Sequence, residues 1–378
     1  MQIEELSDLN CRGKERPWKK HKIQNQKVIE ILNILQDSDR ARKVGQCGNV
    51  LEFAECPNGH GKWLKKAHFC KDRVCVICIY RKGLFTYRQF IQVSHKVIEI
   101  QPNTAFLFLT LTIRNCSPDD LSDTITHLNE AYARLIRRKK IKAVFNGVFK
   151  SLETTYNAET NTFHPHIHAV VAVNKGYFNS RYYISHSELK RLWKKALKVT
   201  YDPDCWIERV KPRRKKINTV NEDILLMDKE MMDRIIVDGA GEVAKYSVKI
   251  NDILNPRIHP EDSPGMVRAK IRLRENSQLQ AEILSHLMKG LNNRRLICYT
   301  GIFKKAYQAL KCTDVEESNL VIMPGEEAVC TCKICQSELV QIHYVWDGGG
   351  YFERSRGRVK GSKSRVVIGP KALGELVH

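Results

Sequence analysis

Two neighbouring stretches decide the fold: residues 143–157, AVFNGVFKSLETTYN, and residues 162–173, TFHPHIHAVVAV. Both are rich in β-branched and aromatic residues, and a short polar segment from Asn157 to Asn161 separates them. This pattern predicts two antiparallel strands joined by a turn. A third such stretch, AFLFLTLTIR (105–114), predicts another strand of the same sheet.

Helices are predicted on both sides of these strands in the chain. Leucine, isoleucine and tyrosine recur at helical spacing from Leu121 to Leu135, and residues 188–198 show a similar apolar face. Further helical segments are expected at 224–237 and 242–249, and a short strand at 206–210. The order predicts an α+β fold in which helices flank a central antiparallel sheet.

His166 and His168 are separated by one apolar residue on a predicted strand. Side chains alternate along a strand, so both imidazoles leave the same face and can bind one metal ion. Glu153, on the preceding strand, is the expected third ligand, and His164 is the alternative. Mixed imidazole and carboxylate ligation suits Mg²⁺ or Mn²⁺ with open positions for phosphate oxygens.

Glu242 and Tyr246 stand four residues apart on a predicted helix and therefore share one face. A phenol can attack a metal-polarised phosphodiester, and a neighbouring glutamate can activate water in a later step. Lys245 and Lys249 could orient the phosphates. The sequence shows no G-x-x-x-x-G-K-[ST] loop, so it indicates no ATP-driven motor.

The charge points to a polyanionic partner. The chain has 63 Lys and Arg against 42 Asp and Glu, a net charge of +21, which favours nucleic acid. Arg213 and Arg214, in the basic loop Lys211–Lys216, are predicted DNA contacts, and residues 11–28 resemble a flexible basic arm. Without a signal peptide or an apolar run near the roughly 20 residues of a membrane span, we expect a cytoplasmic protein with no membrane partner.

Thirteen cysteines in such a compartment favour metal ligation over disulfides. Cys70, Cys75 and Cys78 are spaced as ligands of a structural Zn²⁺, and a fourth ligand would complete a tetrahedral site. Cys47, Cys56, His60 and His68 are the candidates. Such a site would direct Lys71, Arg73 and Arg81 toward DNA.

A second group, Cys330, Cys332 and Cys335, lies near the C-terminus. It could bind another metal ion together with Cys312 or His343. The sequence does not pair it with a second motif.

Several segments together resemble the single-tyrosine plasmid rolling-circle replication initiators (Rep proteins) of the histidine–hydrophobic–histidine (HUH) endonuclease superfamily. The likeness covers most of residues 47–310 in the expected order. The matching segments are CGNVLEF…AHFCKDRVCVICIYRK (47–82), FLTLTIRN (108–115), LETTYN…FHPHIHAVV (152–171), LWKKALKVTY…IERVK (192–211), EVAKYSVK (242–249) and RRLICYTGIFKKAYQAL (294–310).

The resemblance implies an enzyme, a DNA nicking-joining endonuclease. His166 and His168 would hold the catalytic metal with Glu153. Tyr246 would attack origin DNA, leaving a 5′-phosphotyrosyl link and a free 3′-OH primer, and Glu242 would direct water at termination. It also implies an HUH-type sheet, Cys47 as the fourth zinc ligand, and a host helicase and DNA polymerase as partners.

Two other functions fit part of these observations. A transposase or conjugative relaxase would use the same chemistry to join different strands. A non-enzymatic zinc-containing DNA-binding regulator would account for the charge and the cysteines, but not for the histidines, Glu242 and Tyr246.

The composition along the chain predicts five regions. They are a basic N-terminal arm (1–46), a zinc-binding module with a connecting helix (47–100), an HUH nuclease domain with the nucleophile helix (101–255), a C-terminal accessory or DNA-binding region (256–350) and a basic tail (351–378).

Overall fold

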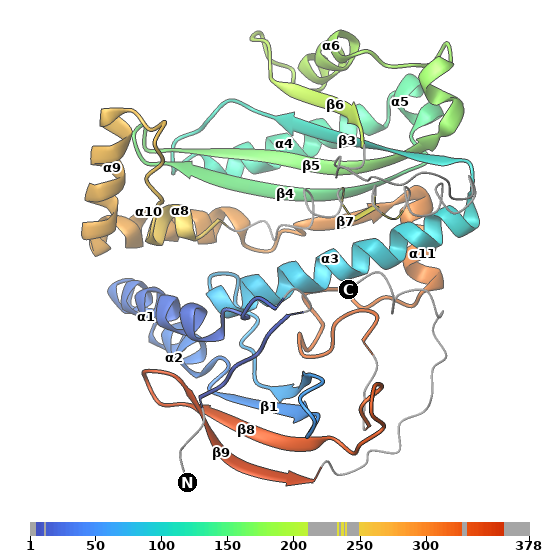
Figure 1. Cartoon of the computed structure of the whole chain (residues 1–378). Helices are drawn as coiled ribbons and strands as arrows, with labels where there is room; N and C mark the ends of the chain where they lie inside the picture. The colour runs from blue at the N-terminus through green and yellow to red at the C-terminus, as the bar shows by residue number, and fades with distance from the viewer. Residues whose placement is uncertain are drawn as a thin grey trace. The chain divides into compact units, whose positions relative to one another are not determined.

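The predicted hairpin forms the centre of a five-stranded antiparallel sheet in the computed structural model (Figure 1). β4 (Gly147–Asn157) pairs with β5 (Thr162–Asn174), and β5 pairs on its other side with β3 (Thr104–Thr112). The edges are β6 (Cys205–Arg209) and β7 (Ile297–Thr300). The α+β class and the antiparallel sheet are therefore confirmed.

The structure describes residues 5–10, 13–210, 249–326 and 331–358, together with Asp233, Ile236, Val237 and Gly239. The predictions for the loop Lys211–Lys216 and for most of the helical segments 224–237 and 242–249 lie outside these residues. The chain divides into two compact units. Unit 1 consists of Met1–Phe85 and Asp314–His378, and unit 2 of Thr86–Thr313.

In unit 2, helices cover both faces of the sheet (Figure 1). One face, with Leu109 and Ile167, is covered by α4 (Leu121–Ile136), whose buried side chains include all residues of the predicted apolar stripe except Tyr132. α5 (Lys139–Val144), η1 (Lys175–Asn179) and α6 (His186–Leu197) complete this part of unit 2.

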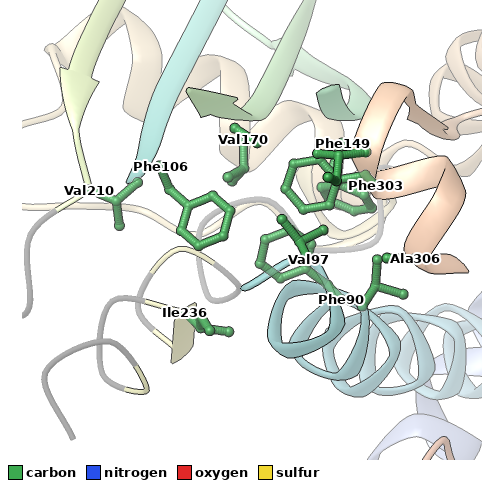
Figure 2. Packing of buried hydrophobic residues seen from close by; sticks show 12 residues of the cluster. Phe90, Val97, Phe106, Phe149, Val170, Val210, Ile236, Phe303 and Ala306 are labelled. Carbon is green, nitrogen blue, oxygen red and sulfur yellow. The ribbon is translucent and has the colours of Figure 1, made fainter. Parts of the chain in front are cut away.

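The opposite face packs against the part of α3 (Val76–Ile100) that belongs to unit 2, and against α11 (Gly301–Ala309). Figure 2 shows Phe90 of α3 among Phe149, Val170 and Phe303. The Phe90 and Phe149 ring centroids are 4.7 Å apart. This cluster anchors one part of the sheet face, and the polar side chains of the histidine site occupy another part of the same face.

The described part of unit 2 also contains α8 (Asn251–Leu254), α9 (Pro264–Glu275) and α10 (Ser277–Leu291). The Ser263 side chain caps α9 and the Asn276 side chain caps α10, and each accepts a backbone N–H of the first turn. In the described part of the chain, no helix combines the length and apolar character needed to cross a membrane.

Unit 1 contains a four-stranded antiparallel sheet in the order β2-β1-β8-β9. The strands are β1 (Val50–Glu55), β2 (Lys62–Ala67), β8 (Val340–Trp346) and β9 (Tyr351–Arg358). β1 pairs with β8, nearly 300 positions later in the sequence, from Val50↔Val345 to Glu55↔Val340.

This pairing corrects the predicted division of the chain. The region 256–350 is not one accessory region, because it contributes β7 to the sheet of unit 2 and β8 to the sheet of unit 1. The beginning of the predicted tail, 351–358, is the strand β9, whose backbone groups pair with β8.

The prediction of a flexible basic arm over residues 11–28 is wrong for its larger part. Trp18–Ile34 forms helix α1, which is followed by α2 (Ser38–Gln46), and the two helices pack on each other. Trp18 and Val28 are buried, and the Lys22 ammonium donates hydrogen bonds to the carbonyl oxygens of Gly45 and Cys47. The Lys22 side chain therefore stabilises the fold, a role that its charge alone did not indicate.

Candidate functional site

Strand register assembles the histidine site. Glu153 of β4 lies directly opposite His166 of β5, and on the other side of β5 Thr110 of β3 lies opposite His168. Directly paired residues of neighbouring strands point to the same face of a sheet. The register therefore places both imidazoles and one carboxylate on a single face, as the sequence predicted.

The three side chains converge on one point. The Nε2 atom of His166 lies 3.9 Å from Glu153 Oε1, and the Nε2 atom of His168 lies 4.0 Å from Glu153 Oε2. All three ligand atoms lie within 4.8 Å of one another. The Glu153 and His166 side chains are 9% and 10% exposed and that of His168 is 22% exposed, so the site opens on the His168 side. Two imidazoles and a carboxylate leave open positions for phosphate oxygens on a divalent metal ion.

Hydrogen bonds orient both rings for this task. His166 Nδ1 lies 3.0 Å from the carbonyl oxygen of His164, and His168 Nδ1 lies 3.1 Å from Thr110 Oγ1. A carbonyl oxygen can only accept, so Nδ1 of His166 carries the proton and Nε2 keeps a free lone pair. Such partners of the ring nitrogen away from the metal fix the tautomer that a metal ligand needs.

His164, the alternative third ligand, is not part of this group of ligand atoms. Its ring lies 5.1 Å from that of His166, but the close group consists of Glu153, His166 and His168. Burial and the neighbouring His166 lower the pKa of His164. The geometry therefore favours Glu153, and His164 contributes its backbone carbonyl.

Lys249 reaches the same carboxylate. Its Nζ atom lies 3.2 Å from Glu153 Oε1, and one third of its side chain is exposed. The cation balances the charge of Glu153. The other predicted residues of the nucleophile helix and the basic loop lie outside the described residues: Tyr246, Glu242, Lys245, Arg213 and Arg214.

A hollow of about 230 Å³ borders the site, and sequence reasoning did not predict it. Thr110, the partner of His168, lines it together with Lys190 and Trp206. Trp206 is 54% exposed, which is unusual for so large an apolar side chain. A single tryptophan on a short edge strand has no sequence pattern that distinguishes it from a core residue.

In unit 1, the four predicted zinc ligands come together as a group that we call the Cys47 cluster: Cys47, Cys70, Cys75 and Cys78. Their sulfur atoms all lie within 4.8 Å of one another, with Cys47 and Cys78 3.6 Å apart. The amide of Cys70 donates to Cys47 Sγ and that of Lys71 to Cys78 Sγ. Four thiolates in this arrangement fit a tetrahedral Zn²⁺.

The other candidates for the fourth position are not part of this cluster. Cys56 and His60 lie instead with Cys332 and Cys335. The partners suggested for the second cysteine group are wrong. Neither Cys312 nor His343 belongs to the group that Cys332 and Cys335 form with Cys56 and His60, and His343 contacts Glu52 and Ser355. Cys330 lies outside the described residues.

Of the three expected DNA-facing cations beside the Cys47 cluster, the structure corrects Arg81 and gives Lys71 and Arg73 partners within unit 1. Arg81 is buried and donates to the carbonyl oxygens of Leu320 and Val321. Lys71 donates to the Glu317 carbonyl oxygen, and Arg73 pairs with the Glu316 carboxylate. These side chains connect the cysteine loop to residues 316–321 within unit 1.

Comparison with known proteins agrees with the motifs. A family model described as "Replication protein" matches residues 61–350. The "Protein rep" of Streptococcus pneumoniae serotype 2 is 32% identical over 93% of this chain and 96% of its own length. Those of Lactiplantibacillus plantarum and Bacillus amyloliquefaciens are 32% and 30% identical, each over 85% of this chain and 90% of their own length.

No solved structure matches the chain significantly. The family match covers most of the chain, including the strands that carry Glu153, His166 and His168 and part of unit 1. Together with the relatives, it confirms the resemblance that the sequence motifs indicated. The chain belongs to the family of plasmid replication (Rep) proteins.

Proposed function

We propose that this protein starts rolling-circle replication by cutting one strand of plasmid origin DNA and joining it covalently to Tyr246. The observation that carries the proposal is the convergence of His166, His168 and Glu153 on one partly open point of the sheet face. In a replication protein, such a ligand set is suited to a metal-assisted reaction on a phosphodiester.

His166, His168 and Glu153 would hold a Mn²⁺ or Mg²⁺ ion. The donor set fits, because both Nε2 atoms and the carboxylate face the same point and the Nδ1 atoms have their own partners. The ion would polarise the scissile phosphate and stabilise the negative charge that develops on it. The histidines supply neutral nitrogen ligands, and Glu153 reduces the net charge of the site.

Tyr246 is the proposed nucleophile. Its phenolic oxygen bonds to the phosphorus, the bond to the 3′ oxygen of the preceding nucleotide breaks, and that oxygen leaves as a 3′-OH. The products are a 5′-phosphotyrosyl link and a primer end. Because a phosphodiester is exchanged for a phosphodiester, the step needs no ATP. Lys249, close to Glu153, is placed to attract the DNA phosphate.

Glu242 is proposed to end the cycle. Glu242 lies one helical turn from Tyr246 in the sequence, and its carboxylate can take a proton from water. The water oxygen would attack the phosphorus of the phosphotyrosyl link, the bond to the Tyr246 oxygen would break, and that oxygen would leave as the phenol. This step would release the DNA without a second tyrosine. It favours replication over the transposase or relaxase function, in which strands are joined to each other.

Basic and aromatic side chains would bind the DNA. Lys245, Arg213 and Arg214 are proposed phosphate contacts from the sequence. The exposed Trp206, beside Lys190 in the hollow next to Thr110, can stack on an unpaired base. Stacking of this kind contributes about 1–3 kcal/mol per base. A host helicase and DNA polymerase would then extend the primer.

The Cys47 cluster is proposed to hold a structural Zn²⁺. An ion bound by all four thiolates, three of which are buried, would have no open coordination position for substrate. The ion would fix the loop that carries Cys70 and Cys75 against α1, where Asn25 donates to Cys75 Sγ.

The decisive experiment traps the covalent intermediate. The protein is incubated with a labelled single-stranded origin oligonucleotide and Mn²⁺, and denaturing electrophoresis detects the adduct. Wild type should form it and Tyr246→Phe should not. Tyr183→Phe, which changes an exposed tyrosine of unit 2, should react like wild type. An adduct of undiminished yield in Tyr246→Phe would refute the assignment of the nucleophile.

Glu242→Ala separates the two halves of the reaction. This variant should form the adduct at a normal rate but release it slowly, because the nucleophile remains and the base is lost. A chase with unlabelled oligonucleotide measures the release. Normal release would remove the proposed role of Glu242 and leave that of Tyr246 untouched.

A further inference from the structure

A second group of metal-binding side chains lies in unit 1, outside the Cys47 cluster. We call it the Cys56 cluster: Cys56, His60, Cys332 and Cys335. Cys56 and His60 belong to the turn between β1 and β2, and Cys332 and Cys335 to the turn before β8. Their four ligand atoms all lie within 4.8 Å of one another.

The distances have the dimensions of a tetrahedral zinc site. Cys56 Sγ lies 3.5 Å from Cys335 Sγ and 3.5 Å from His60 Nδ1, and Cys332 Sγ lies 3.7 Å from the same Nδ1. Zinc–sulfur bonds of about 2.3 Å at tetrahedral angles place two sulfur atoms ~3.8 Å apart. A disulfide would need about 2.05 Å, so these thiols are not bonded to each other.

Tight backbone turns aim the side chains of both segments. In Cys56-Pro-Asn-Gly-His60, the Gly59 amide donates to the Cys56 carbonyl oxygen, and Gly59 has a φ of +76°. In Cys332-Lys-Ile-Cys335, the Cys332 amide donates to the Ser337 carbonyl oxygen, and the Gln336 amide donates back to Cys332. Each turn thus brings two ligands of one short segment to the same side.

The surroundings suit thiolate ligands. Asn58 Nδ2 donates a hydrogen bond to Cys335 Sγ at 3.3 Å. Ala54 and Leu339 are buried beside Cys56 and Cys332 and form an apolar base under the group. The group contains no carboxylate, and three sulfurs with one imidazole are a common ligand set of structural zinc and a poor one for Mg²⁺ or Ca²⁺.

We propose that Cys56, His60, Cys332 and Cys335 bind a second structural Zn²⁺ that clamps the two halves of unit 1 together. Cys56 and Cys335 are 279 positions apart, and the whole of unit 2 lies between them in the chain. A bond between such distant segments offsets a large loop-closure entropy. The proposed zinc site lies next to the Glu55↔Val340 pair, at the end of the β1–β8 pairing.

The test counts zinc in the full chain by native mass spectrometry after loading with Zn²⁺ and removal of excess metal. Wild type should retain two equivalents, Cys75→Ser one and His60→Ala one. His60→Cys should retain two, because a fourth thiolate replaces the imidazole. His60 is exposed, so its substitution leaves the core intact. Cys330→Ser, which changes a cysteine that the proposed ligand set does not include, should also retain two.

X-ray absorption identifies the ligands of the remaining ion. In Cys75→Ser, the zinc that stays should have three sulfur neighbours and one nitrogen neighbour, whereas in His60→Ala it should have four sulfur neighbours. Two equivalents in His60→Ala, or loss of one in Cys330→Ser, would overturn the assignment. A wild-type protein with one equivalent, surrounded by four sulfurs, would do so as well. None of these measurements depends on DNA cleavage. Their outcome is therefore independent of the proposed nicking reaction.

Discussion

At the scale of single residues, Thr110 shows how a hydroxyl group sets the chemistry of a metal ligand. It holds Nδ1 of His168 at 3.1 Å and so leaves Nε2 directed at Glu153. Removing such a partner typically weakens metal binding 10- to 100-fold. We expect Thr110→Val to raise the Mn²⁺ concentration needed for half-maximal nicking by about tenfold or more.

Thr112 offers a matched control on the same strand and face. It lies opposite His166, but its hydroxyl donates to the Asp204 carbonyl oxygen. Thr112→Val should therefore leave the Mn²⁺ dependence unchanged. If both variants shifted this dependence equally, the effect would come from the strand and not from the hydrogen bond to His168.

At the scale of elements, the join of β7 to α11 depends on a glycine. Gly301 has a φ of +54°, and a Cβ atom there would lie 2.2 Å from the Asn146 carbonyl oxygen. That oxygen also accepts the Ile302 amide, so β4 and α11 approach each other closely at this point. Left-handed backbone and a steric clash both oppose any side chain.

We expect Gly301→Ala to lower the free energy of unfolding of unit 2 by about 1–3 kcal/mol. Urea unfolding followed by circular dichroism measures the change. Gly176→Ala is the control, because a Cβ atom at Gly176 meets nothing within 4 Å. Equal stability of the two variants would show that the backbone adjusts at Gly301 without cost.

At the scale of the whole molecule, α9 carries part of the net charge of +21. Its sequence PGMVRAKIRLRE carries four cations before a single acid. Lys270 pairs with Asp262, and Arg274 donates to the Pro256 carbonyl oxygen, whereas Arg268 and Arg272 are exposed and line a hollow of about 490 Å³. These two arginines are suited to phosphate contacts.

The salt dependence of DNA binding tests this surface. Each phosphate contact contributes about 0.9 to the slope of log K against log salt on duplex DNA. Arg268→Ala combined with Arg272→Ala should therefore lower that slope by about 1.8, as measured by fluorescence anisotropy with origin duplex. Arg42→Ala, which removes an exposed arginine paired with Asp39 on α2, should not lower it. Parallel slopes for all three proteins would exclude α9 from the DNA interface.

The sequence by itself determined what depends on local periodicity. Alternation along one strand placed His166 and His168 on one face, and Glu153 on the neighbouring strand was the expected third ligand, with His164 as the alternative. The structure brings Glu153, His166 and His168 together. Helical spacing located α4 in the same way. Short spacing brought Cys70, Cys75 and Cys78 together, and the family pattern added Cys47.

The tertiary structure decided what depends on distant segments. Local patterns do not state which strand pairs with β1, that Cys56 and His60 meet Cys332 and Cys335, or that Arg81 is buried against Leu320. Contacts over such separations form only when the folded chain repays the entropy of closing a long loop. The same argument applies to Trp206, whose exposure beside Thr110 follows from the neighbours that the sheet brings to it.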